Sequence, residues 1–432
     1  MRGVCCLVVG SLLAACNAGP EATAAPSPPT PPAPVAPAPA PPPAPAGPGA
    51  PQPCLQDDTA KGPAHDAMTL TRVAHKDLPG WADDKQSEAV PSFLRSCEKL
   101  AAMRDDAPVG VNGHGGFAYQ WRAACAAAKK VPAGDDAAAK KMFESEFVAW
   151  QVAGKAGVDG LLTAYNVQPM KASRKKGGKF QTPVFARPKD LAMIDLSLYV
   201  GDAHGRKLWG KFDANGEIVP YLTRPEIRKG ALAGKGLEIM YVADPVDLLF
   251  AHIEGSAKAV MDDGTTVWLE FAGKNGRAYK GVGGVLKEMG VLTGAYNGTM
   301  QGIRKWFHDN MGRFDEVVDQ VTSYVFFKES AQAGAVGTQM TILTPERSLA
   351  VDRAFIALST PAWVDTRAPV AGKVGVEAPF RKLLIAQDTG GAITNAVRGD
   401  IYMGDTEEAV ERAGRMGAKG RVWLLLPKGV AK

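Results

Sequence analysis

The sequence has few of the residues from which metal centres are built. It holds six cysteines and six histidines among 432 residues. No two cysteines have Cys-x-x-Cys spacing, and the histidines are not spaced as metal ligands are. We therefore expect neither a metal nor any other cofactor.

An excess of charge of one sign is also missing. The 50 lysines and arginines are nearly balanced by 45 aspartates and glutamates, which leaves a formal net charge of +5. A domain that binds nucleic acid usually carries a strong basic excess. We therefore expect no nucleic acid among the partners.

Apolar residues and glycine are abundant. Hydrophobic residues make up 46% of the chain, and 48 residues are glycine. The length suggests two or three domains, at roughly 150 residues per domain. Short apolar runs bounded by glycine favour strands joined by tight turns over a helix bundle.

The N-terminus is typical of an exported bacterial protein. Arg2 precedes an apolar run over 4–15, which is too short to span a bilayer as a stable anchor. The run ends in Leu-Ala-Ala-Cys16, which resembles a lipobox, where cleavage leaves an acylated cysteine. We expect a lipoprotein signal peptide over 1–15 and lipidation of Cys16; an ordinary signal peptide with a chance cysteine is the alternative. Asn17 indicates the outer membrane, with the protein facing the periplasm.

Three cysteines follow Cys16, namely Cys54, Cys97 and Cys125. An oxidising periplasm permits one disulfide. Because Cys97 and Cys125 both fall in segments with a helical pattern, we predict that they pair and that Cys54 stays free. Three free thiols are the alternative.

Residues 20–53 are almost entirely proline and alanine. Such a run cannot form a core and adopts polyproline II, at ~3.1 Å per residue. It would reach on the order of 100 Å. We therefore assign 16–77 to a lipid anchor and tether.

From 78 to 157 the apolar residues recur with a helical period. Phe93, Cys97 and Leu100, for example, share one face. Helices are expected over 89–103, 117–129 and 135–150. We expect a small N-terminal helical cap.

After Gly157 the pattern changes to short strands bounded by turns, spaced as in a barrel protein. Strands are expected over 161–165, 183–186, 191–200, 238–242, 267–271, 324–327, 339–343, 382–386 and 421–426, with helices over 282–289 and 300–311. A basic loop over 171–179 is either solvated or a contact for an anionic polymer.

The stretch 386–404 contains acids at the ends of strand-like segments. Asp388 and Asp400 bracket Gly390-Gly391, whose backbone freedom suggests a tight turn. Asp352 also ends a strand-like run. Aspartates beside glycine are usually turn residues, but acids at the mouths of buried strands are unfavourable unless paired or functional.

Ordered motifs run through most of 78–428. They include Arg224-Pro-Glu-Ile-Arg-Lys-Gly230, Asp244-Pro-Val-Asp247, Ile253-Glu-Gly-Ser256, Arg347-Ser-Leu-Ala-Val-Asp352, Ala386-Gln-Asp-Thr-Gly-Gly-Ala-Ile393 and Val397-Arg-Gly-Asp400. Together they resemble the membrane-bound lytic murein transglycosylase A (MltA) family, whose C-terminal part is called the 3D domain after three aspartates.

The resemblance implies a mainly β fold behind the N-terminal helical cap over 78–157. One domain would be a double-psi β-barrel built from both ends of the core, 158–167 plus 325–432. A β-rich substrate-binding domain, 168–324, would be inserted between these parts. Glycan strands of peptidoglycan would lie in the groove between the two domains.

The resemblance also implies a reaction. The family cleaves the β-1,4 bond between N-acetylmuramic acid and N-acetylglucosamine, and the C6 hydroxyl of muramic acid closes a 1,6-anhydro ring. Because the nucleophile belongs to the substrate, one carboxyl can act first as acid and then as base. The resemblance places it on Asp400, with Asp388 and Asp352 as neighbouring acids. We expect Asp400 to be partly buried, with a pKa raised by burial and by a nearby like charge.

Substrate contacts are implied on two walls: Thr163, Tyr165, Gly390, Gly391 and Tyr402 on one, and Glu254, Gly255 and Ser256 on the other. Core packing is the alternative for Tyr165, and turn chemistry for Gly255 and Ser256. Glu254 stands where the family usually has glutamine. It would add a negative charge to the groove unless a cation such as Lys258 pairs with it.

Two classes of function follow. The leading one is an enzyme that releases anhydro products. Its rival is an outer-membrane lipoprotein that binds murein with little or no turnover. Glycan strands, membrane lipid at Cys16 and complexes of cell-wall synthesis or hydrolysis are the expected partners.

Overall fold

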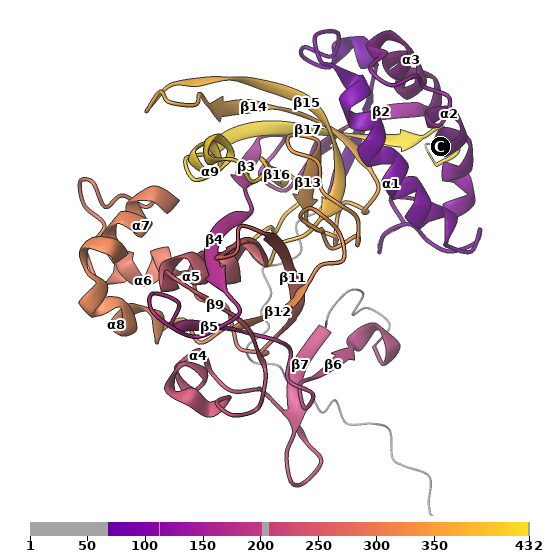
Figure 1. Ribbon diagram of the computed structural model, residues 1–432. Helices are drawn as coiled ribbons and strands as arrows, with labels where there is room; N and C mark the ends of the chain where they lie inside the picture. The colour runs from indigo at the N-terminus through magenta and orange to yellow at the C-terminus, as the bar shows by residue number, and fades with distance from the viewer. Residues whose placement is uncertain (1–67, 112, 201–206, 431–432) are drawn as a thin grey trace, which may run out of the picture. The chain divides into compact units, whose positions relative to one another are not determined.

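The computed structural model in Figure 1 describes residues 68–111, 113–200 and 207–430, and all of them belong to one compact unit, Gly62–Lys432. The expected signal peptide, Cys16, the tether over 20–53 and Cys54 lie outside the described residues. Within those ranges, no helix combines the length and the apolar character needed to cross a membrane.

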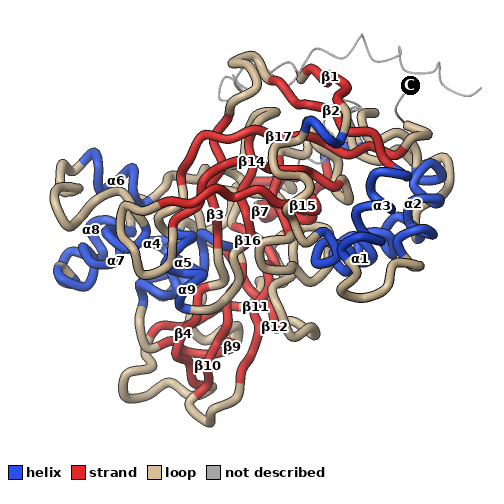
Figure 2. Tube along the Cα trace, turned by 90° about the horizontal axis from the view of Figure 1, so that it is seen from above, coloured by secondary structure: helices blue, strands red, loops and turns tan. Residues whose placement is uncertain are grey.

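Six strands close into a β-barrel in the order β17, β14, β15, β13, β16 and β3, and the pairing of β3 with β17 completes the ring. The paired strands β17, β14 and β15 lie side by side in Figure 2. Strands β2 and β1 extend the same sheet beyond β17. The strands are β1 (Thr69–Val73), β2 (Phe147–Ala153), β3 (Gly160–Tyr165), β13 (Ser348–Val351), β14 (Pro361–Pro369), β15 (Glu377–Asp388), β16 (Arg398–Tyr402) and β17 (Gly417–Pro427).

The barrel is held together by an apolar interior. Leu162, Leu349, Leu384, Ile401 and Leu424 come from five of its strands and are almost completely buried in one cluster. Since β3 fits between β16 and β17, a segment near the start of the core completes a barrel formed mainly by its end. The expectation of a mainly β fold with such a barrel is confirmed.

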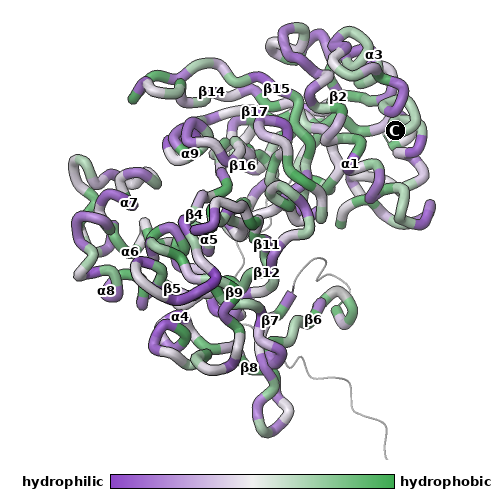
Figure 3. Tube along the Cα trace, viewed as in Figure 1, coloured by the Kyte–Doolittle hydropathy of each residue, from purple (hydrophilic) through white to green (hydrophobic). Residues whose placement is uncertain are grey.

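Three helices form the N-terminal helical region, α1 (Val90–Ala101), α2 (Arg122–Ala128) and α3 (Asp136–Glu146). The rings of Phe93, Phe143 and Phe147 pack together, with centroids 5.6 to 6.0 Å apart. The same cluster includes Leu383 of β15, so these helices cover one side of the barrel sheet. Hydrophobic residues are conspicuous along β2 and the middle of β15 (Figure 3).

A disulfide joins Cys97 of α1 to Cys125 of α2, which is the pair that the sequence suggested. The two Cα atoms are 5.6 Å apart. The described part of the chain thus contains the bridge expected from an oxidising compartment.

Two boundaries at the start of the folded body differ from expectation. Strand β1 lies inside 16–77, which we assigned to the anchor and tether, because Thr69–Val73 pairs in register with β2. The expected helix over 135–150 ends at Glu146, where β2 begins. Burial largely alternates from Phe147 onward, and this period of two favours a strand.

Two differences concern later segments. Residues 339–343 form no strand: Met340 has a φ of 59° and its N–H bonds the Gly337 carbonyl within a turn. Residues 325–329, which we assigned to the barrel, are instead β12 of the inserted sheet. Phe326 and Phe327 are fully buried in the inserted part, which explains this placement.

The inserted part contains a six-stranded sheet, ordered β12-β11-β10-β4-β9-β5, and a three-stranded sheet, β6-β7-β8. Its strands are β4 (Gln168–Ser173), β5 (Thr182–Phe185), β6 (Ala192–Asp195), β7 (Lys207–Phe212), β8 (Ile218–Val219), β9 (Glu238–Val242), β10 (Ser256–Met261), β11 (Thr266–Lys274) and β12 (Val325–Glu329). The remaining helices are α4 (Arg224–Glu226), α5 (Pro245–Glu254), α6 (Val282–Glu288), α7 (Met300–Asp309), α8 (Phe314–Val318) and, next to the barrel, α9 (Glu407–Ala413).

Polar contacts join the inserted part to the barrel. The N–H of Val167, between β3 and β4, donates to the Gly404 carbonyl at 2.9 Å. Lys258 Nζ of β10 lies 2.6 Å from Asp405 Oδ2. These contacts bring the start of β10, and with it the end of α5, to the end of the barrel where β16 finishes.

Candidate active site

Strand register places Asp388 and Asp400 in one row across the barrel. Asp400 on β16 pairs with Thr163 on β3 and with Ala350 on β13, and Ala350 pairs with Asp388 on β15. A register shift between Leu349 and Ala350 brings Asp388 to this position. One strand separates the two aspartates, so their backbones are about 10 Å apart. The small side chain of Ala350 leaves room between them.

Asp400 is partly buried and has one hydrogen-bond donor from a side chain. Thr163 Oγ1 donates to its Oδ1 at 2.5 Å. Burial raises the pKa of Asp400 and the nearby Asp388 charge adds to this, while the Thr163 hydrogen bond and Arg398 oppose it. The expectation of a partly buried Asp400 with a raised pKa is confirmed.

Asp388 is surrounded by donors. Its Oδ1 accepts from the Thr338 N–H at 2.8 Å, from Thr338 Oγ1 at 2.9 Å and from the Thr389 N–H at 2.8 Å, and its Oδ2 accepts from the Tyr165 hydroxyl at 2.7 Å. Burial raises the pKa of Asp388, and these hydrogen bonds oppose the rise. Four donors favour the ionised form of Asp388, whereas one donor leaves Asp400 better able to keep its proton.

Asp352 makes different contacts from this pair. Its Oδ1 accepts from the Ala354 N–H and its Oδ2 from the Asn395 N–H, both at 2.9 Å. Asn395 belongs to the segment that links β15 to β16. Asp352 therefore fastens that segment, and backbone N–H groups engage both of its carboxylate oxygens.

The two tyrosines differ in their contacts. Tyr165 and Tyr402 pack against each other with ring centroids 5.3 Å apart, and both are almost fully buried. Burial and the Asp388 charge raise the pKa of Tyr165 well above its usual range, so its hydroxyl keeps the proton that it donates. Tyr165 is thus both a packed residue and a partner of Asp388, whereas Tyr402 mainly packs.

The Gly390-Gly391 pair differs from expectation, because neither residue has the positive φ that favours glycine. A Cβ at Gly390 would approach Ile393 Cγ1 to 2.8 Å, while a Cβ at Gly391 would meet nothing within 4 Å. Gly390 is therefore required because a side chain there would collide with Ile393, and not because its backbone needs a positive φ.

Glu254 ends α5, and Gly255 closes the helix with a φ of 75°. Ser256 follows and is buried. The pKa of Glu254 is raised well above its usual range by burial and then by the charges of Asp400 and Asp388. Glu254 therefore lies close enough to both aspartates to be repelled by them.

Glu254 has no ion-pair partner among the described residues, because Lys258 binds Asp405 instead. Three carboxyl groups thus share one region, and the charges of the two aspartates disfavour ionisation of Glu254. No group of three or more potential metal-ligating side chains that could hold a metal ion occurs in the described part of the chain.

The sequence did not point to Thr338 or Thr389. Both donate to Asp388, but Thr338 lies 50 positions before it, beside the segment wrongly expected to be a strand.

A cavity of about 560 Å³ also lies in the inserted part, lined by Arg224, His252 and Tyr324 among others. None of the three carboxyls lines this cavity, so it is separate from the candidate active site.

Known domain families match both halves of this arrangement. The MltA specific insert domain matches residues 161–328, and the 3D domain matches residues 347–426. The barrel and its inserted sheet therefore define a protein in which a 3D domain is combined with an MltA-specific insertion.

The chain belongs to the MltA family. A crystal structure of MltA from Neisseria gonorrhoeae is 32% identical, with a TM-score of 0.71 and coverage of 84% of this chain and 93% of that one. A membrane-bound lytic murein transglycosylase from Agrobacterium tumefaciens is 29% identical, with a TM-score of 0.72 and coverage of 84% and 99%.

Among curated relatives, membrane-bound lytic murein transglycosylase A of Vibrio cholerae is 35% identical over 205 residues. The match covers 47% of this chain and 55% of that protein. The chain thus spans about half the length of this relative.

Proposed function

We propose that the protein is a lytic transglycosylase of peptidoglycan. It would cleave the β-1,4 bond between N-acetylmuramic acid and N-acetylglucosamine and leave a 1,6-anhydromuramic acid end. The observation that carries the proposal is the unequal setting of two partly buried aspartates, with four donors on Asp388 and one on Asp400. The names of the family members support the same reaction.

Asp400 acts twice in the proposed reaction. Its protonated carboxyl gives a proton to the glycosidic oxygen, and the bond from that oxygen to C1 of muramic acid breaks. The Asp400 carboxylate then takes the proton of the C6 hydroxyl while the C6 oxygen bonds to C1. No water is consumed, and Asp400 ends protonated as it began.

Asp388 stays ionised in this scheme. Its charge favours the positive charge that develops at C1, and it helps to hold the pKa of Asp400 up for the first step. Thr163 occupies Oδ1 of Asp400, which leaves Oδ2 to carry the proton. Asp352 contributes by fixing the segment between β15 and β16.

The sugar contacts extend over both walls. Thr163, Tyr165, Gly390, Gly391 and Tyr402 line the barrel side, and Glu254, Gly255 and Ser256 line the inserted side. A protonated Glu254 can donate a hydrogen bond, as the amide of glutamine would. A protonated Glu254 carries no negative charge, so it would not repel an acidic polymer.

The wider arrangement is proposed on the same basis. The barrel is of the double-psi kind, with parallel pairs β13–β15 and β16–β3 in support, and the inserted domain binds glycan. Acylated Cys16 would anchor the chain to the outer membrane, the part of 16–77 that precedes β1 would be the tether, and complexes of wall enzymes are the further partners.

Incubation of the purified protein with murein sacculi, followed by mass spectrometry, tests the proposal. Anhydro-muropeptides are expected from the wild type and not from a folded Asp400→Asn variant. Products with reducing muramic acid ends would indicate hydrolysis. Binding without any product would favour the murein-binding lipoprotein.

A further inference from the structure

We propose that Gln387 and Gln339 are positioning residues that tie the carboxylate of Asp388 to helix α1. The helical region would then help to set the geometry of the active site. The inference rests on the proposed function, because it concerns the residues that flank Asp388 and its donor Thr338.

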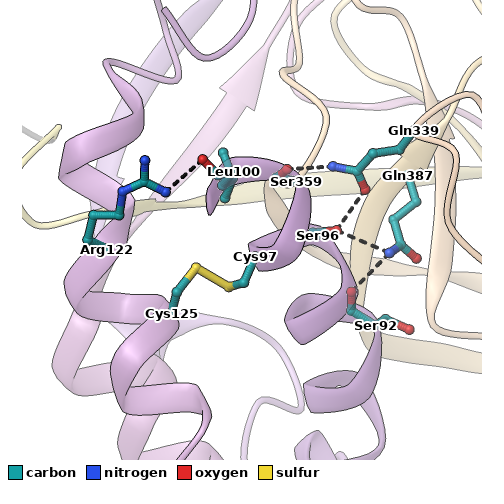
Figure 4. The surroundings of a disulfide bond; sticks show 9 residues. All are labelled: Ser92, Ser96, Cys97, Leu100, Arg122, Cys125, Gln339, Ser359 and Gln387. Atoms are coloured by element: carbon teal, nitrogen blue, oxygen red, sulfur yellow. Dashed lines mark hydrogen bonds between the residues drawn. A yellow bond between two sulfur atoms is a disulfide. The ribbon is translucent and has the colours of Figure 1, made fainter. Parts of the chain in front are cut away.

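Gln387 directly precedes Asp388 on β15 and is fully buried. Neighbouring residues of a strand point to opposite faces, so Gln387 leaves the barrel on the side away from Asp388. Its Nε2 donates to the Ser92 carbonyl at 2.9 Å and to Ser96 Oγ at 3.1 Å (Figure 4). Its Oε1 accepts from Ser348 Oγ at 2.7 Å, so the amide is bound at both ends.

Gln339, which follows Thr338, makes a second connection to α1. Ser96 Oγ donates to its Oε1 at 2.7 Å, and its Nε2 donates to Ser359 Oγ at 2.5 Å (Figure 4). Its backbone N–H also donates to the Gln387 carbonyl at 3.0 Å. Since Thr338 precedes Gln339 and gives two donors to Asp388, a fixed Gln339 holds those donors in place.

Both connections end on α1 at Ser92 and Ser96, which lie one helical turn apart on one face and are fully buried. Cys97, the next residue, is bonded to Cys125 of α2, and Arg122 of α2 donates to the Leu100 carbonyl at 2.7 Å. Helix α1 is therefore fastened to a neighbour as well as to the barrel (Figure 4).

Stability alone does not explain the hydrogen-bond network between α1 and the two glutamines. An apolar contact between α1 and β15 would be at least as stabilising as buried amides and hydroxyls, and it would need no partners. A satisfied polar network instead specifies one arrangement. Precision matters at Asp388, because a displacement of about 1 Å can change a catalytic rate by roughly 100-fold.

The first test replaces Gln387 with methionine, which has a similar shape but no amide. In Gln387→Met we expect product release at saturating sacculi to fall by roughly 10-fold or more, with sacculus binding retained. The alkaline limb of the pH profile should move to lower pH, because the Asp388 charge is then held less firmly near Asp400.

Gln86→Met is the matched control. Gln86 is also a buried glutamine of the helical region, and its Nε2 donates to the Trp81 carbonyl at 2.7 Å, without a contact to Asp388 or Thr338. It should lower the unfolding temperature but leave the rate and the pH profile of the folded protein as in the wild type. If the rate and the pH profile changed equally in both variants, Gln387 would contribute only to stability.

A double-mutant cycle tests whether Gln387 acts through Asp388. Thr338→Val removes the hydroxyl donor to Asp388 and keeps the N–H donor. If both residues act by placing Asp388, the loss of rate in the double variant will be smaller than the product of the two single losses. Strictly independent losses would overturn the proposal.

A substrate-free measurement separates this proposal from the proposed function. Carbon-13 NMR of labelled aspartate carboxyls, assigned with Asp388→Asn, follows the titration of Asp388. Its midpoint should change in Gln387→Met and not in Gln86→Met. An unchanged midpoint would refute the positioning role, whereas a wild type without anhydro product but with the expected NMR change would refute only the proposed function.

Discussion

The hydroxyl of Tyr165 donates a 2.7 Å hydrogen bond to Oδ2 of Asp388, although 223 positions separate the two residues in the chain. The contact forms because β3 completes the barrel beside β16, three places from β15 in the strand order. Closure of the barrel by an early strand thus supplies one of the four donors that oppose the rise in the pKa of Asp388.

Tyr165→Phe should therefore weaken catalysis more than it weakens folding. It removes one donor from a buried carboxylate, so the charge of Asp388 is less stable and its position less fixed. We expect product release to fall by roughly 10- to 100-fold, and the free energy of unfolding to fall by about 1 to 2 kcal/mol.

Rates from sacculus digestion and urea unfolding measure the two effects. Tyr221→Phe is the matched control, since Tyr221 also donates to an aspartate, Asp190, at 2.8 Å, but within the inserted part. A Tyr165→Phe variant that is as active as this control would show that the tyrosine only packs.

Thr163→Val should move the pH profile upward. The Thr163 hydrogen bond lowers the pKa of Asp400, so its loss raises that pKa. Because the proposed reaction begins with protonated Asp400, activity should be lost as pH rises through this pKa. The alkaline limb should therefore move to higher pH, which is opposite to the change expected for Gln387→Met.

Initial rates across a pH series give the position of the limb. Thr366→Val serves as the control, since the Thr366 hydroxyl donates to the Lys419 carbonyl at 2.9 Å away from the carboxyls. A limb that stays in place, or moves to lower pH, would contradict the assignment of Asp400 as the acid.

Part of this site could be predicted from the sequence. The barrel built from both ends of the core and the neighbourhood of Asp388 and Asp400 follow from motifs whose order along the chain is preserved. Local patterns also predicted α1 and α2, because apolar residues at a helical period bury one face.

Other features depend on contacts between distant segments. Thr338 reaches Asp388 only through the turn around Met340, where a short apolar run looked like a strand. The register shift at Ala350 decides which residue faces Asp400, and no sequence pattern encodes it. Asp352 matched the acid motif, yet two backbone N–H groups fix its carboxylate elsewhere.

Arg347→Met should destabilise the protein strongly. Arg347 is 2% exposed and binds Asp84, of which 3% is exposed, with two contacts of 2.8 Å, and it also reaches Glu88. Without the guanidinium, the Asp84 charge stays buried between the helical region and β15. We expect a loss of about 3 to 5 kcal/mol.

Urea unfolding at neutral pH measures this loss. Arg104→Met provides the control, because Arg104 and Asp106 form an ion pair whose side chains are 83% and 70% exposed, and such pairs contribute about 0 to 1 kcal/mol. Similar losses in the two variants would show that the Arg347 cluster is screened by water.

Glu254→Gln should stabilise the protein, and the gain should depend on pH. The pKa of Glu254 is raised well above its ordinary value of 4.5, so the folded state binds this proton more tightly than the unfolded state does. A raised carboxyl pKa weakens folding as pH rises above the unfolded value, and the deficit is complete once pH passes the folded-state pKa. Glutamine cannot ionise and has no such deficit.

The gain in Glu254→Gln should thus be absent below about pH 4 and grow with pH, by about 1.4 kcal/mol for each unit of pKa difference. Urea unfolding of both proteins from acidic to mildly alkaline pH measures it. Glu98→Gln, at an exposed position of α1, should show no comparable trend. If the two proteins differed in free energy of unfolding by the same amount at every pH, Glu254 would have an ordinary pKa and be ionised in the folded protein at neutral pH. The proposed murein-binding wall would then carry an unpaired negative charge.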